Sequence, residues 1–142
     1  MKTLVILDNE PGSTEGMEGI LQRHGFLIVP VAAAAEAAAI AGSADLLIAG
    51  FDESGDMSAI ELHEVCPETP LLLVSETPLD RWPEKEFLYF KALSSRTDFL
   101  RKPLSAGSFV TRVNALLYNS SYSAGRKTFE DAAANRVPPV PA

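Results

Sequence analysis

Several short apolar runs of this sequence end in residues that could do chemistry. Four of the runs lead into Asp8 with Asn9, Gly50, Ser75 and Lys102. Short continuous apolar runs are typical of strands buried in a parallel sheet, and open α/β sheets bind ligands beyond the carboxyl ends of their strands. We therefore expect the chemistry of this chain where these runs end. Gly50, at the end of the central run, contributes no side chain there.

Other residue sets that support catalysis or metal binding do not stand out. The turn after the first run holds a single glycine, Gly12, so it is not a glycine-rich phosphate loop. His24 and His63 are expected on surface helices, where they make no metal set. Cys66 stands beside Pro67 and is expected to be a buried filler, not a reactive thiol. The sequence therefore gives little support to an enzyme.

The elements that position these residues alternate along the chain. Apolar runs predict strands at 4–7, 26–31, 45–50, 71–74 and 99–100. Apolar spacing and alanine content predict helices at 13–23, 32–41, 59–65, 84–93 and 105–118. Such alternation predicts an α/β fold, namely a three-layer (βα)5 flavodoxin-like, doubly wound parallel sheet with strand order 2-1-3-4-5.

Composition limits the classes of protein to consider. The chain has 142 residues, of which 46% are hydrophobic, enough for one domain with a core. A net charge of -7 disfavours binding to a nucleic-acid backbone. A single cysteine excludes an internal disulfide and suits the cytoplasm. The sequence shows neither a signal peptide nor an apolar stretch long enough to span a membrane.

The composition changes after Tyr118. Asn, Ser and Gly follow first, and later the run 137–141 contains three prolines. We therefore assign residues 1–118 to one domain and residues 119–142 to a linker or flexible tail, in which 128–136 is a candidate short helix.

Four fragments together resemble the receiver domain of bacterial two-component response regulators. They are Ile6–Pro11, Asp45–Gly50, Leu73–Ser75 and Asp98–Pro103. Each fragment is weak alone, but their order, with Lys-Pro before a final amphipathic helix, is fairly specific. The resemblance covers about residues 2–118 and implies the five-stranded parallel fold stated above.

In that family a histidine kinase transfers a phosphoryl group to an aspartate that ends the third strand. An acidic pair after the first strand and the acceptor together hold Mg²⁺. The resemblance places Asp8 and Asn9 at the acidic pair, so the second acid is replaced by its amide. It places Gly50 at the acceptor position, which implies that the acceptor is lost.

The resemblance also assigns positions on the last two strands. Ser75 matches the hydroxyl residue and Lys102 the lysine that bind the phosphoryl oxygens in the family. Phe99 matches the aromatic residue that rotates inward on activation. With no phosphoryl group to bind, we expect Ser75 to hydrogen-bond nearby backbone and Phe99 to be a core residue or a half-exposed filler, not a switch.

The implied pocket has lost negative charge. Mg²⁺ prefers carboxylate oxygens in an octahedral arrangement, so we expect at most weak binding at Asp8 and no required cofactor. A lysine at a buried strand end needs a partner, and we expect Lys102 to form a structural ion pair with Asp8.

Asp52 is an alternative acceptor. It points to the same side as Gly50 in an extended strand, but it lies about 6–7 Å further along the chain. Phosphoryl transfer depends on in-line positioning, which disfavours Asp52 and favours a solvated loop acid.

The sequence therefore predicts a phosphorylation-independent, receiver-like interaction module. The alternative is a receiver still switched by phosphorylation at an acid such as Asp52. The resemblance implies that a partner protein, an effector domain or a second copy in a homodimer would bind the face that the family uses for such contacts, built here from 84–93, 99–100 and 105–118. Aromatic residues crowd this region and indicate either a packed core or a contact patch: Trp82, Phe87, Tyr89 and Phe90.

Overall fold

The computed structural model describes residues 1–7, 15–50, 58–93, 96–102, 105–118 and 124–135. Its strands are β1 (Thr3–Leu7), β2 (Leu27–Val31), β3 (Leu46–Gly50), β4 (Leu71–Ser75) and β5 (Thr97–Arg101). Its α-helices are α1 (Glu15–Arg23), α2 (Ala34–Ala38), α3 (Ser58–Val65), α4 (Glu84–Ala92), α5 (Ala106–Tyr118) and α6 (Ala124–Asn135). Two 3-10 helices complete the described elements, η1 (Ala41–Ser43) and η2 (Leu79–Arg81).

The strands form one parallel sheet in the order β2-β1-β3-β4-β5, which confirms the predicted fold class and strand order. The strands β1, β3 and β4 occupy the centre, and their residues Leu4–Leu7, Leu46–Ala49 and Leu71–Ser75 are all buried. Continuous apolar runs therefore correspond to the strands that are covered on both faces.

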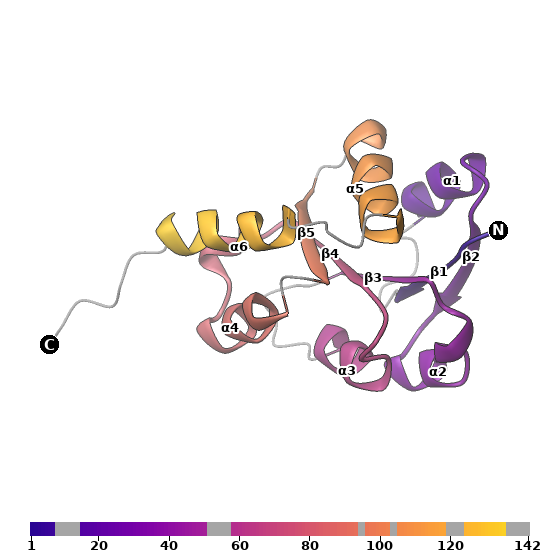
Figure 1. The fold of residues 1–142 in the computed structure, drawn as a ribbon, viewed down its shortest axis with the longest axis horizontal. Helices are drawn as coiled ribbons and strands as arrows, with labels where there is room; N and C mark the ends of the chain where they lie inside the picture. Colours follow the sequence, from indigo (N-terminus) through magenta and orange to yellow (C-terminus); the bar gives the residue numbers. More distant parts are fainter. Residues whose placement is uncertain (8–14, 51–57, 94–95, 103–104, 119–123, 136–142) are drawn as a thin grey trace, which may run out of the picture.

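Helices cover both faces of the sheet (Figure 1). Leu4 and Ile6 of β1 face a core that includes residues of α1 and α5. Val5 and Leu7, the alternate residues of the same strand, face a second core that includes residues of α2, α3 and α4. This alternation follows from the two-residue repeat of a strand and gives the three predicted layers.

Two elements differ most from their predicted bounds. The alanine-rich helix covers only Ala34–Ala38 and not 32–41, and η1 follows it. Alanine favours a helix but offers little side chain to bury, and Ala33 provides no capping hydrogen bond. The last strand is longer than predicted, because Thr97 and Asp98 are buried parts of it despite their polar side chains.

Part of the segment assigned to a linker or flexible tail is folded onto the domain. Residues Ala124–Asn135 form α6, which contacts β5, η2 and α4. Phe129 is fully buried in the same core as α4. Its pairing with Phe87 gives the helix a packed position, and α6 overlaps the candidate short helix at 128–136. The domain boundary after Tyr118 stays a prediction.

Within the described residues, no helix is both long and apolar enough to cross a membrane.

Candidate functional site

The carboxyl ends of β3, β4 and β5 lie in order along one edge of the sheet. Gly50 is the last residue of β3, where it pairs with Val74, and Ser75 ends β4, where it pairs with Arg101. The backbone N–H of Lys102 donates a hydrogen bond to the Ser75 carbonyl oxygen at 2.8 Å. The structure therefore brings Gly50, Ser75 and Lys102 to one edge, as the strand order predicts.

The remaining predicted site residues, Asp8, Asn9 and Asp52, lie outside the described residues, so their contributions stay predictions. The ion pair between Asp8 and the half-buried Lys102 is untested for the same reason. Among the residues that the structure describes, no three or more His, Cys, Asp or Glu side chains gather into a metal-binding group. The described part of the edge alone does not fit the carboxylate ligands that Mg²⁺ needs.

The backbone at Gly50 does not require glycine. Gly25 is the one described residue with a positive φ, so Gly50 has a conformation that other residues adopt. Among the described residues, a Cβ atom built at Gly50 would meet only the Val74 carbonyl oxygen within 4 Å, at an ordinary contact distance of 3.9 Å. Gly50 is also exposed. Neither backbone strain nor crowding by the described residues explains why this strand ends without a side chain.

The loop that follows β4 hydrogen-bonds the side chain of Ser75. Its side chain is buried, and its Oγ accepts a hydrogen bond from the backbone N–H of Thr77 at 3.1 Å. This bond confirms the expectation that Ser75 hydrogen-bonds nearby backbone. The Thr77 carbonyl oxygen in turn accepts a hydrogen bond from Trp82 Nε1 at 3.2 Å. The loop after β4 is thus tied to the indole ring of Trp82.

Trp82 joins this loop to Phe99. The two rings meet edge to face with centroids 5.3 Å apart, and Phe99 is only 7% exposed. A second edge-to-face contact joins Trp82 to Phe90 at 6.0 Å. Phe99 is therefore part of the core, as expected. The hydrogen bond and ring contacts of Trp82 were not predicted, although a lone Trp between two proline-containing turns was a visible signal.

Most of the crowded aromatic side chains belong to the core and not to a contact patch. Trp82, Phe87 and Phe90 are each at most 3% exposed. Phe87 meets the buried ring of Phe129 at 6.0 Å, so α6 covers part of this aromatic cluster. No sequence pattern indicates that Phe129 lies here, because it is the one large apolar residue in a polar helix.

Tyr89 is the half-buried member of the group and connects α4 to α3. The Tyr89 hydroxyl lies 2.9 Å from His63 Nδ1, and the two rings meet edge to face. Burial lowers the pKa of His63, and the charge of Glu64 partly opposes that shift. Burial raises the pKa of Tyr89, and Glu64 raises it further. Both shifts favour neutral side chains at this helix contact.

An ion pair between β5 and α5 was missed at the sequence level. Asp98 is fully buried, and its Oδ2 lies 2.6 Å from Arg112 Nη1. Asp98 Oδ1 accepts a hydrogen bond from the Phe99 backbone N–H at 2.7 Å. An acid before two apolar strand residues and an arginine on the last helix were the available signals. The pairing depends on how the helix crosses the sheet, which the sequence does not show.

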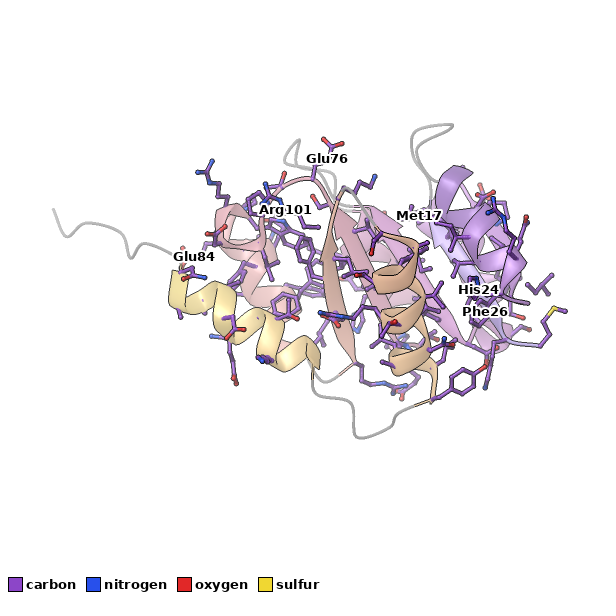
Figure 2. The ribbon with its side chains drawn as sticks, turned by 90° about the horizontal axis from the view of Figure 1, so that it is seen from above. Met17, His24, Phe26, Glu76, Glu84 and Arg101 are labelled. Carbon is purple, nitrogen blue, oxygen red and sulfur yellow. The ribbon has the colours of Figure 1, made fainter. Side chains whose placement is uncertain are left out.

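At the same edge, Arg101 and Glu76 lie next to each other (Figure 2). Arg101 Nε donates to the Glu76 carbonyl oxygen at 3.3 Å, which links β5 to the loop after β4.

Cys66 is buried, and burial raises the pKa of its thiol, consistent with a filler residue.

Comparison with known proteins supports the fold. The chemotaxis protein CheY4 of Vibrio cholerae is 18% identical, with a TM-score of 0.63 over 82% of this chain and 99% of the other. A two-component response regulator from Clostridium difficile is 21% identical, with a TM-score of 0.62 over 86% and 100%. A response regulator receiver protein from Burkholderia phymatum is 18% identical, with a TM-score of 0.64 over 82% and 95%.

These identities are low, so the likeness shows a shared fold. The structural neighbours are receiver proteins, in agreement with the resemblance carried by the four fragments. No known protein-family model matches this chain, and no curated protein matches it.

Proposed function

We propose that this chain is a receiver-like signalling module of two-component type that binds a protein partner without being phosphorylated. The observation that carries the proposal is Gly50, which ends the central strand β3 without a side chain although neither its backbone conformation nor the described residues around it require glycine. A phosphoryl group has no oxygen to bond at that position. The proposal assigns the chain no catalytic activity and no required metal cofactor.

The surrounding contacts support a module that does not switch. The Ser75 hydroxyl accepts a hydrogen bond from the backbone N–H of Thr77, and Phe99 is already packed against Trp82. In the receiver family the corresponding aromatic is the group that moves. Here its burial favours one arrangement with no phosphoryl group present, and the module would signal through its surface.

The partner surface we propose is the face formed by α4, β5 and α5. Leu88 on α4 is 51% exposed despite its apolar side chain. A partner protein, an effector domain or a second copy of this chain would bind there. Buried Cys66 is compatible with the cytoplasm, where such partners would be found.

Intact-protein mass spectrometry after incubation with acetyl phosphate and Mg²⁺ tests the proposal. We expect no added phosphoryl group on the natural chain. The matched variants are Gly50→Asp and Gly50→Asp combined with Asn9→Asp, which restore the acceptor and the acidic pair. A covalent adduct on the double variant would show that the assay detects transfer on this fold.

The alternative function predicts the opposite result. A phosphoryl group on the natural chain that disappears in Asp52→Asn would establish Asp52 as acceptor and refute the proposal. Isothermal titration with Mg²⁺ is a second check, because tight binding by the natural chain would contradict the expected loss of the metal site. A broad, weak titration is the expected outcome.

A further inference from the structure

Helix α6 occupies part of the face to which the proposed function assigns a partner. It lies beyond β5 at the far end of the sheet from β2, with α4 beside it (Figure 1). The five parallel strands are complete without α6, since β5 already pairs with β4. The helix is therefore an added layer over the edge strand and η2.

The attachment of α6 depends on a narrow stripe of residues. Phe129 is fully buried, and Ala132 and Ala133 pack against the same core at helical spacings of three and four residues. On the other side of the helix, Glu130 and Asp131 are exposed. One large apolar side chain therefore anchors a helix of 12 residues.

The surface under α6 is apolar and aromatic. Phe87 is 3% exposed in the presence of α6 and contacts the Phe129 ring. Leu79 of η2 and Trp82 belong to the same buried cluster. Removal of α6 would uncover this apolar surface of η2 and α4, against which the Phe129 ring now packs. The helix now in place shows which chemistry that surface accepts.

Building on the proposed function, we propose that α6 is a detachable cover over a helix-binding groove formed by η2, α4 and β5. The occupant that replaces it is an amphipathic helix of a partner protein, with an aromatic anchor followed by small residues three and four positions later. Release of α6 and partner binding are then coupled, because both helices use the same groove.

The groove also lies close to the contacts that hold the edge of the sheet. Trp82 contacts Phe99 and hydrogen-bonds the loop after Ser75, and it shares a core with Phe129. Replacement of α6 by another helix in the groove can thus alter the side-chain packing at the carboxyl edge of the sheet. Partner binding, and not phosphorylation, would be the input to this module.

Native-state hydrogen exchange on the full chain tests whether α6 detaches. We expect amides of α6 to exchange at least roughly tenfold faster than those of β4, through local opening that does not require global unfolding. Exchange of both elements at one common rate, set by global unfolding, would overturn the proposal and make α6 an integral part of the core.

Peptide binding tests the groove itself. The probe is a fluorescein-labelled peptide with the sequence of residues 124–135, added to the full-length natural chain, to Phe129→Ala and to the matched surface variant Glu130→Ala. We expect the peptide to bind Phe129→Ala at least roughly tenfold more tightly than the other two, because the groove is then unoccupied. A probe peptide carrying the Phe129→Ala change should not bind.

Equal affinity of the probe for all three chains would overturn the proposal. If Phe129→Ala fails to fold, that result also counts against a detachable cover, and the exchange rates of the natural chain decide independently. The phosphoryl-transfer assay does not involve α6, so failure of the groove and failure of the proposed function are distinguishable.

Discussion

The ion pair between α5 and β5 allows a quantitative test of how the last strand is held. Arg112 Nη1 lies 2.6 Å from Asp98 Oδ2, and the exposed fractions of the two side chains are 32% and 0%. Replacing Arg112 with leucine leaves an apolar side chain at this position of α5 but removes the cation. The Asp98 carboxylate then stays buried, with the Phe99 backbone N–H still donating to its Oδ1.

The expected loss of stability follows from burial. Removing one partner of a fully buried ion pair costs about 3–5 kcal/mol, because the remaining charge is uncompensated. Arg112 is about one-third exposed, so water already screens part of the interaction. We therefore expect Arg112→Leu to lower the free energy of unfolding by about 2–4 kcal/mol. That is a large fraction of the roughly 5–15 kcal/mol that stabilises a typical domain.

Urea unfolding followed by circular dichroism and by the fluorescence of the single Trp measures this loss. The matched control is Arg96→Leu, since Arg96 pairs with Glu68 at 3.6 Å and both side chains are mostly exposed, at 52% and 92%. An exposed pair contributes about 0–1 kcal/mol, so the control should unfold near the natural midpoint.

Two results would refute this account of the ion pair. One is an Arg112→Leu chain within about 0.5 kcal/mol of the Arg96→Leu control, a margin typical of neutral surface changes. The other is a double variant, Arg112→Leu with Asp98→Asn, that is no more stable than Arg112→Leu alone. An asparagine carries no charge and can still accept the Phe99 N–H, so the second change should restore part of the lost stability.

The remaining predictions concern the strand end and the helix contact. Gly50→Ala should stabilise the chain by about 0.4–1 kcal/mol in thermal unfolding, because the folded conformation accepts a Cβ and the unfolded chain loses freedom; destabilisation would show that glycine is required. Burial lowers the pKa of His63, so the unfolded state takes up its proton first. Stability should therefore fall as the pH drops below the usual histidine value of about 6.5, and His63→Gln should reduce this pH dependence in urea unfolding.

The sequence predicted the sheet well because burial on both faces leaves a clear pattern. The runs in β1, β3 and β4 are continuous and apolar, and the predicted lengths are within one residue of the five-residue strands. The alternation of strands and helices then restricts the order of strands. Gly50, Ser75 and Lys102 were correctly placed at one edge for this reason, while their roles stay predictions.

Features that depend on side-chain packing were not predictable in the same way. Asp98 and Arg112 are 14 residues apart and meet only because α5 crosses β5. Phe129 is one apolar residue in a polar segment, so no periodic pattern indicates which surface it covers. The alanine-rich helix was overestimated for the opposite reason, since its composition favours helix but offers little to bury.

The packing of Phe99 indicates why this module should stay in one conformation. Turning the ring outward would expose a side chain that is now 7% exposed and break its contact with Trp82. Exposing a Phe side chain costs about 1.5–3 kcal/mol, and losing an aromatic pair about 0.5–1.5 kcal/mol more. A ligand shifts such an equilibrium only by its difference in affinity for the two states. Gly50 offers no side chain through which a covalent signal could supply that difference, so we expect the inward ring to persist until a change in the aromatic cluster itself moves it.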